Sequence, residues 1–228
     1  RRRRRARLRS IPGRRVRVIF YATPMSSYSA KVRIALCVKG VDFEERLPPN
    51  GYRSAEYRAI VPMGTLPAIQ RDGWVLSESE VINEYLEECY SAPAMLPPDP
   101  TLRARVRFLS RFHDLYLEPR VRALFPLVKV PRRDPAQVTN LRADIALRLQ
   151  QLEEWAQPQP YLLTPDISLA DCGPLVTLPL AMAVLTACGQ PLELPSGLQT
   201  WLDNASGHHG VQRALSGWHT ATQAWLAT

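Results

Sequence analysis

A proline-rich stretch divides this chain into two segments with different hydrophobic periodicity. Residues 91–100 read SAPAMLPPDP, and prolines at this density interrupt both helices and strands. Before this stretch, strand-like and helical patterns alternate; after it, only helical patterns occur. We therefore expect an α/β domain over residues 16–90, a linker over 91–100 and an all-helical domain over 101–228. At 228 residues with 46% apolar residues, the chain can fill such cores.

The first segment predicts a small α/β unit of about 75 residues. Its strands are β-branched or aromatic runs, and its helices show apolar residues at helical spacing. Gly40 ends the first helix, and Arg71-Asp72-Gly73 forms the turn of a hairpin. The expected elements are a strand at 16–21, a helix at 27–39, a strand at 42–47, a short helix at 54–60, a hairpin of 67–70 with 74–76, and a helix at 78–90.

The second segment predicts helices throughout. Two long amphipathic helices are expected over residues 102–117 and 137–155, and a further helix opens at Ser168. Two more fit residues 198–204 and 209–226. The sequence shows no internal repeat.

The positive charge of the chain is concentrated at its start. The formal net charge is +8, but ten arginines and no acidic residue lie in residues 1–17, so the remainder is slightly acidic. Such a block is usually disordered. We expect residues 1–15 to be a dispensable basic tail, and binding to nucleic acid is unlikely except through it.

Cysteine usage and hydropathy indicate a soluble protein. The four cysteines lie far apart without a Cys-x-x-Cys pair. No run approaches the roughly 18 apolar residues of a membrane span. We expect reduced thiols, no membrane association and a cytoplasmic location.

Four motifs in order along the chain resemble the cytosolic glutathione transferase superfamily. They are MSSYSAKVRIAL (25–36), PMGTLPAI (62–69), LSES (76–79) and SLAD (168–171). The resemblance covers about residues 16–226. It implies a thioredoxin-like domain with a mixed four-stranded sheet followed by a helical bundle. It also implies a homodimer that uses glutathione as co-substrate, without a metal.

The resemblance assigns a glutathione-binding role to several residues. Pro67 is expected to follow a cis peptide bond, so that the backbone of Leu66 pairs with the extended tripeptide. Glu78 and Ser79, at a helix N-terminus, are expected to hold the α-amino and α-carboxylate groups of the γ-glutamyl end. The glycine carboxylate is assigned to Lys39 or the Arg53 region, without a choice between them.

Two of these motifs also have a purely structural interpretation. Ser77 with Glu80 fits a capping box at the third helix, which is compatible with ligand binding by the next residues. Ser168 with Asp171 fits a capping box as well, and there the structural role is favoured. Changing Asp171 should therefore harm folding before ligand binding.

The hydroxyls at the first helix are the expected catalytic groups. By resemblance to serine-type classes, Ser26 donates a hydrogen bond to the glutathione thiol, with Ser27 as a second donor that can also cap the helix. Lowering a thiol pKa by about two units needs roughly 2.7 kcal/mol. One hydrogen bond to an anion supplies about 1.5–3 kcal/mol, and the helix N-terminus adds about 0.3–1 kcal/mol.

Tyr28 separates this chain from thiol transferases. The first motif is most similar to that of the zeta class, with Tyr28 at the position of its cysteine. Cys37 lies too far along the helix to replace that cysteine, so disulfide-exchange activities are disfavoured. His113 could line the electrophile pocket, but a surface or interhelical position is favoured.

Three functions therefore remain. The leading one is conjugation of glutathione to a small apolar electrophile. A zeta-like isomerase is one alternative. The other is a non-catalytic protein of the stringent starvation protein A type, which acts by binding RNA polymerase; the serine at position 26 favours an enzyme.

Overall fold

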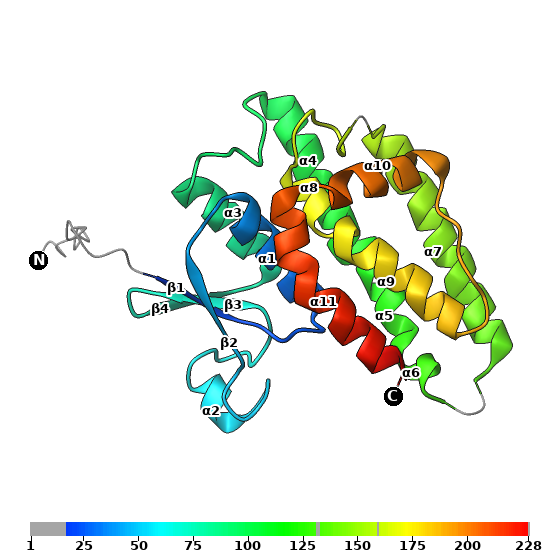
Figure 1. Cartoon of the computed structure of the whole chain (residues 1–228), viewed down its shortest axis with the longest axis horizontal. Helices are drawn as coiled ribbons and strands as arrows, with labels where there is room; N and C mark the ends of the chain where they lie inside the picture. The colour runs from blue at the N-terminus through cyan, green and yellow to red at the C-terminus, as the bar shows by residue number, and fades with distance from the viewer. Residues whose placement is uncertain (1–16, 131–132, 159, 228) are drawn as a thin grey trace, which may run out of the picture.

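A computed structural model describes residues 17–130, 133–158 and 160–227 of the chain. The predicted basic tail, residues 1–15, lies outside these ranges. The first domain contains a four-stranded mixed sheet in the order β2-β1-β3-β4 (Figure 1). Strands β1 and β2 are parallel, and β3 is antiparallel to both β1 and β4. The strands are β1 (Val18–Tyr21), β2 (Phe43–Arg46), β3 (Ala68–Arg71) and β4 (Trp74–Ser77).

Helices cover both faces of this sheet, as the alternation of side chains along β1 requires. Val18 and Phe20 lie in the main core, which includes side chains of α1 (Ser27–Val38) and α3 (Ser79–Cys89). Ile19 and Tyr21 point to the opposite face, where Tyr57 of α2 (Ala55–Arg58) completes a smaller cluster. The predicted mixed four-stranded sheet is confirmed.

The second domain is helical in every described element. Of the linker expected over residues 91–100, residues 91–99 contain no helix or strand, and Pro100 begins α4. The elements are α4 (Pro100–Phe112), the π-helical turn η1 (His113–Leu117), α5 (Glu118–Ala123), α6 (Phe125–Val128), α7 (Pro135–Ala156), α8 (Leu169–Cys172), α9 (Pro174–Ala187), α10 (Ser196–Ser206) and α11 (His209–Ala227).

The sequence predicted a continuous α-helix over residues 102–117, and this prediction is wrong for its last residues. In the structure α4 ends at Phe112, and the π-helical turn η1 precedes α5. Pro119 lacks the amide proton that would bond the carbonyl of Leu115 in a regular helix. The guanidinium of Arg120 donates to that carbonyl instead, at 3.2 Å. Within this turn, Nδ1 of His113 and Oδ1 of Asp114 lie 2.9 Å apart.

One expectation from hydropathy also needs correction. Residues 169–187, spanning α8 and α9, are long and apolar enough to cross a membrane by length and composition. However, 78% of this segment is buried inside the protein. It is the central helical segment of the second domain, which explains why its composition is apolar on all sides.

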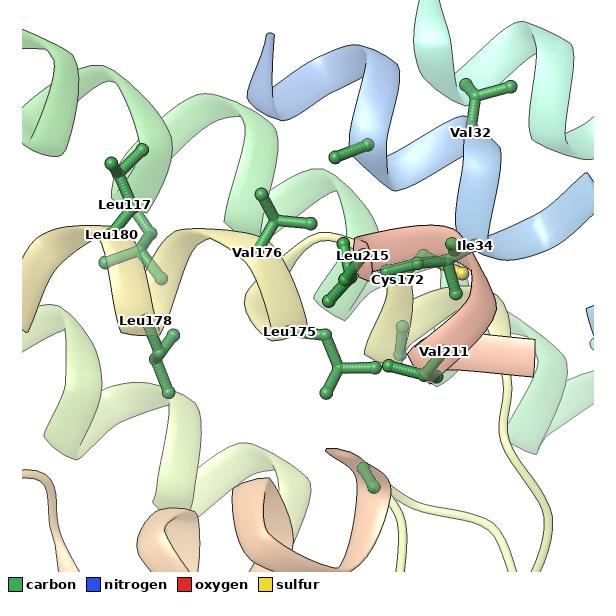
Figure 2. Packing of buried hydrophobic residues seen from close by; sticks show 14 of the residues in the cluster. Val32, Ile34, Leu117, Cys172, Leu175, Val176, Leu178, Leu180, Val211 and Leu215 are labelled. Carbon is green, nitrogen blue, oxygen red and sulfur yellow. The ribbon is translucent and has the colours of Figure 1, made fainter. Parts of the chain in front are cut away.

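Helix α1 connects the two domains through a shared core. Figure 2 shows Ile34 of α1 beside Cys172 of the central helical segment and Leu215 of α11, and Val32 and Val176 belong to the same core cluster. Helices α1 and α11 pack closely where Gly210 meets Val38. A Cβ at position 210 would lie 2.9 Å from the Val38 Cα, so only glycine fits without displacement.

Candidate functional site

A cleft of about 970 Å³ lies between the sheet domain and the helices η1, α5 and α6. Both domains contribute charged side chains to its wall, and the first domain also contributes hydroxyl groups. The first domain supplies the start of α1, the loop before β3 and the start of α3, and the second supplies five residues. Among the predicted site residues, the cleft is lined by Ser26, Tyr28, Arg53, Leu66, Pro67, Glu78 and Ser79.

Ser26 occupies the N-cap of α1 and lies in the cleft wall. Its Oγ accepts a hydrogen bond from the backbone N–H of Ser29 at 3.2 Å. Because this bond uses only a lone pair of the oxygen, the hydroxyl proton stays available for a ligand. Capping and donation into the cleft are therefore compatible in one residue.

The expected role of Ser27 is wrong in this geometry. Ser27 is buried, does not line the cleft, and is not the cap of the helix. Its hydroxyl donates to Glu118 and accepts from Arg122, whose Nη2 lies 2.8 Å away. Adjacent residues at a helix start point about 100° apart, so only one of the two serines can face the ligand.

Tyr28 contributes a neutral phenol to the cleft. The guanidinium of Arg122 lies 4.6 Å from the centre of its ring. Burial and the negative charge of Glu118 raise the pKa of Tyr28 to about 12, although Arg122 opposes this. Tyr28 can therefore donate a hydrogen bond at physiological pH, but it does not act as a phenolate.

The peptide bond between Leu66 and Pro67 is cis, as predicted. Tyr57 donates from its hydroxyl to the neighbouring Thr65 carbonyl at 3.0 Å, which fixes this turn. Among the described residues, the backbone N–H and C=O of Leu66 form no hydrogen bond. An extended peptide can use both groups as an added strand.

Glu78 and Ser79 lie at the N-terminus of α3, as expected. Glu78 is exposed and has a φ of 77°, a left-handed conformation that costs a non-glycine residue about 1–3 kcal/mol. Ser79 is the first residue of the helix and is 7% exposed. Both line the cleft at the positive end of the helix dipole.

The capping interpretation of this helix start is wrong. Glu78, rather than Ser77, is the N-cap residue, and its side chain forms no capping bond. Glu80 turns inward instead, where it accepts hydrogen bonds from Lys31 and Ser110, both at 2.6 Å. By contrast, the capping box of Ser168 and Asp171 is confirmed.

Of the two candidates for the glycine carboxylate, only Arg53 reaches the cleft. Lys39 is buried near the far end of α1. Its ammonium donates to the carbonyls of Tyr90 and Pro93, at 2.7 and 2.9 Å, and pairs with Glu87 at 2.5 Å. Its expected role in binding is therefore wrong, and it holds the start of the linker instead.

Comparisons with known proteins give this geometry a context. A family model described as the glutathione S-transferase N-terminal domain matches residues 20–94. A glutathione S-transferase of Pseudomonas putida is 30% identical over 170 residues, which cover 70% of this chain and 73% of that protein. The chain belongs to the glutathione S-transferase family.

Other relatives within this family carry different names. A maleylacetoacetate isomerase of Pseudomonas aeruginosa is 45% identical over 94 residues, which cover 38% of this chain and 44% of the isomerase. The chain thus matches less than half of that isomerase. A stringent starvation protein A homolog of Coxiella burnetii is 30% identical over 158 residues, covering 67% of this chain and 70% of that protein.

Solved structures share the glutathione transferase fold. A Bombyx mori glutathione transferase superimposes with a TM-score of 0.77 at 18% identity, covering 92% of this chain and 97% of that one. A zeta-class maleyl pyruvate isomerase gives a TM-score of 0.73 at 24% identity, covering 88% and 97%. The predicted thioredoxin-like domain and helical bundle are confirmed at the level of the fold.

The structure of this member of the glutathione S-transferase family adds charged residues that the sequence patterns did not reveal. The cleft wall also contains Arg111, Asp114 and Arg122. Below it, the buried ammonium of Lys31 lies 2.9 Å from Asp114. Burial disfavours ionisation of Asp114, but the hydrogen bond from His113 and the charge of Lys31 outweigh it and lower its pKa to about 2.

A weak sequence signal pointed to Lys31. The largely apolar run VRIALCV follows Lys31 in the sequence and favours a buried helix, and a lysine inside a buried helix needs an acidic partner. That partner could not be named in advance because Asp114 is 83 residues away along the chain.

The remaining candidates lie away from the cleft. Cys37 is buried, and its burial raises the pKa of its thiol. His113 occupies an interhelical position, as favoured, and is 2% exposed. Within the described ranges, no group of three or more His, Cys, Asp or Glu side chains is arranged to hold a metal ion.

Proposed function

We propose that this protein is a glutathione-dependent transferase in which the Ser26 hydroxyl stabilises the glutathione thiolate. The observation that carries the proposal is the position of Ser26 in the cleft. Its oxygen is fixed at 3.2 Å from the Ser29 amide at the start of α1, and its proton remains free to be donated. The nucleophile is the sulfur of the co-substrate, so the protein needs to supply only a donor.

The energetics of this arrangement are sufficient. A hydrogen bond to a charged acceptor contributes about 1.5–3 kcal/mol, which corresponds to about one to two units of thiol pKa. The first turn of α1 adds a favourable dipole. Tyr28, which is neutral and lines the same cleft, is the next available donor.

The other cleft residues fit the rest of the tripeptide. We place the cysteine backbone against the unpaired peptide groups of Leu66 and the γ-glutamyl carboxylate at Ser79. Glu78 then faces the ammonium group, and Arg53 is available to the glycine carboxylate. A homodimer in the cytoplasm remains part of this proposal, by analogy with the family.

A second candidate activity is glutathione-dependent isomerisation of a carboxylate substrate. Relatives named maleylacetoacetate isomerase match the first domain of the chain. Two cations, Arg111 and Arg122, lie in the part of the cleft formed by the second domain. The electrophile half of the cleft is therefore less apolar than the sequence suggested, and an anionic electrophile fits it better than a hydrocarbon.

A third candidate is a non-catalytic role of the stringent starvation protein A type. The Coxiella burnetii relative supports it, whereas the position of Ser26 supports an enzyme. Retention on immobilised glutathione, followed by a chloronitrobenzene conjugation assay and an isomerase assay with maleylacetoacetate, distinguishes all three. Retention with turnover supports an enzyme, and the active assay identifies the reaction. Absence of both retention and turnover would favour the non-catalytic role.

The catalytic assignment is tested with single substitutions at the start of α1. We expect Ser26→Ala to lower kcat about tenfold or more, since it removes a donor to the thiolate. Tyr28→Phe and Ser27→Ala should have smaller effects on the thiol pKa. An unchanged rate in Ser26→Ala would transfer the role to Tyr28.

Loss of the helix cap needs its own control, because Ser26→Ala also removes a cap worth about 1 kcal/mol. Ser54 also caps a helix, α2, with its Oγ 3.0 Å from the Tyr57 amide; its hydroxyl donates to the Pro49 carbonyl at 2.6 Å, and it does not line the cleft. Ser54→Ala should lose similar stability while retaining full turnover.

A further inference from the structure

A buried chain of polar side chains runs beneath the cleft from α3 to α9, and His113 occupies its centre. Its Nδ1 lies 2.9 Å from Oδ1 of Asp114, and its Nε2 lies 2.7 Å from Oγ1 of Thr177. The ring also packs tightly against the second domain. A Cβ at Gly173 would lie 2.4 Å from its Nδ1, so the glycine leaves room for the imidazole.

Each nitrogen of this ring faces an acceptor. Asp114 is ionised and offers only lone pairs. Thr177 has a single hydroxyl proton, which it donates to Oε2 of Glu118 at 2.5 Å. Its oxygen can therefore only accept from His113.

The partners of Glu118 support this direction of donation. Its other oxygen, Oε1, accepts from Ser27 and from Nε of Arg122 at 2.9 Å. Glu118 is fully buried and paired with Arg122, so it is a carboxylate. If His113 had no proton on Nε2, the Thr177 proton would turn to the ring, and a lone pair would face Glu118.

The charges around His113 are compatible with this assignment. The network contains the carboxylates of Glu80, Asp114 and Glu118 and the cations of Lys31 and Arg122. A positive charge on His113 makes these six side chains neutral together, whereas a neutral ring gives balance when Arg111 is counted with them, so the hydrogen bonds of the ring, rather than the charges, decide the assignment. Arg111 lies at the solvent edge, 3.4 Å from Asp114.

We propose that His113 is a doubly protonated positioning residue that fixes Asp114 directly and, through Thr177 and Glu118, holds the Arg122 guanidinium over Tyr28 in the cleft. His113 does not line the cleft itself. Its charge acts by keeping two carboxylates in place, one in the cleft wall and one beneath it. The consequence for turnover rests on the proposed function, whereas the protonation and the placement of Arg122 do not.

The protonation is tested by NMR in a chain whose sole histidine is His113. The chain has four histidines, and the other three, His208, His209 and His219, are half-buried or exposed. Replacing them as His208→Asn, His209→Gln and His219→Gln leaves the network untouched. At neutral pH we expect slowly exchanging protons on both ring nitrogens of His113. One unprotonated nitrogen would overturn the proposal.

The positioning role is tested with Thr177→Val, and Thr177→Ser serves as the matched control. The valine removes the link between His113 and Glu118, so the Arg122 Nε–H resonance should shift and exchange faster. With serine, which restores the hydroxyl, the wild-type resonance should return. An unchanged Arg122 signal in Thr177→Val would overturn the positioning role.

Turnover provides a separate readout. We expect Thr177→Val to lower kcat about tenfold with KM for glutathione within about twofold, and Thr177→Ser to restore kcat. A wild-type kcat in Thr177→Val also contradicts the positioning role. If the wild-type protein does not turn over glutathione, the proposed function fails, and the two NMR measurements still decide the protonation and the placement of Arg122.

Discussion

The ammonium of Lys31 lies 2.6 Å from Oε2 of Glu80, and both side chains are buried between α1 and α3. Lys31 also contacts Asp114 of η1 at 2.9 Å. One buried cation thus joins two carboxylates from different domains. Removing it would leave both of them without their main counter-charge.

We therefore expect Lys31→Met to lower the free energy of unfolding by about 3–5 kcal/mol, because removing one partner of a buried ion pair leaves uncompensated charge. Urea denaturation at neutral pH measures this change. Arg107→Met is the matched control, since Arg107 pairs with Glu84 at the surface at 2.7 Å. It should cost at most about 1 kcal/mol. Equal costs in the two variants would contradict the buried-pair interpretation.

Asp114 predicts a specific loss of stability in acid. Its pKa in the folded protein is about 2, below the ordinary value of 3.8. The carboxylate therefore stabilises the folded protein at every pH at which it is ionised in both the folded and the unfolded state. This contribution, about 2 kcal/mol, is complete above about pH 5 and is lost as the pH falls to about 2. Asp114→Asn should be less stable than wild type at neutral pH and nearly equal to it in strong acid.

Urea midpoints at several pH values measure this difference. Asp203→Asn, at an exposed position in α10, should follow the wild-type curve throughout. A constant offset between Asp114→Asn and wild type at all pH values would argue against the low pKa of Asp114.

Asp171 predicts a loss of stability without a direct loss of ligand binding. Its carboxylate accepts four hydrogen bonds: from the amides of Leu162 and Ser168 at 2.9 and 2.7 Å, from the Ser168 hydroxyl at 2.7 Å and from the Trp201 indole at 2.8 Å. Asp171→Ala leaves these buried donors unpaired and should cost about 3 kcal/mol or more. Asp166→Ala, five residues earlier and exposed, should be near neutral.

Thermal unfolding and glutathione affinity together test this assignment. Where Asp171→Ala remains folded, it should bind glutathione as wild type does. Weakened binding in a fully folded variant would show that the structural role of Asp171 is incomplete.

Replacement by alanine should have opposite effects on stability at two glycines of α11. Gly210→Ala should destabilise the protein by about 1–3 kcal/mol, because the new Cβ meets the backbone of Val38 at 2.9 Å. Gly217 has no heavy atom within 4 Å of such a Cβ. Gly217→Ala should therefore stabilise the helix by up to about 1 kcal/mol. Differential calorimetry compares the two, and equal shifts in Tm would contradict the close packing of α1 and α11.

Much of the fold could be predicted because its signals are local. Alternating and helical periodicities placed the strands and most helices, and the Leu66–Pro67 turn followed from its motif. The break at His113 could not be predicted in this way. It depends on Pro119 and on a side-chain bond from Arg120 that replaces the missing amide.

The site could be predicted where a motif carries it, as for Ser26, Leu66, Glu78 and Ser79. The sequence could not predict which of two adjacent residues at a helix start points into the cleft. That depends on the rotation of the helix about its axis, which directs Ser26 into the cleft and Ser27 away from it. The assignment of Lys39 was wrong for a different reason: the helix expected over residues 27–39 already placed Lys39 at the end opposite Ser26, so its distance from the cleft could be predicted. The polar network under the cleft was missed because its partners are far apart along the chain, as with Ser27 and Glu118, 91 residues apart.

The packing of α11 on α1 has a consequence for biosynthesis. A ribosome releases α1, with Ser26 at its start, well before it releases α11. Until then, the surface of α1 that meets Gly210 remains uncovered. A nascent chain can form the sheet before α11 emerges, but the helix that carries Ser26 acquires this neighbour only when α11 has been synthesised. Truncation before α11 should therefore expose apolar surface on α1, a helix made much earlier in translation.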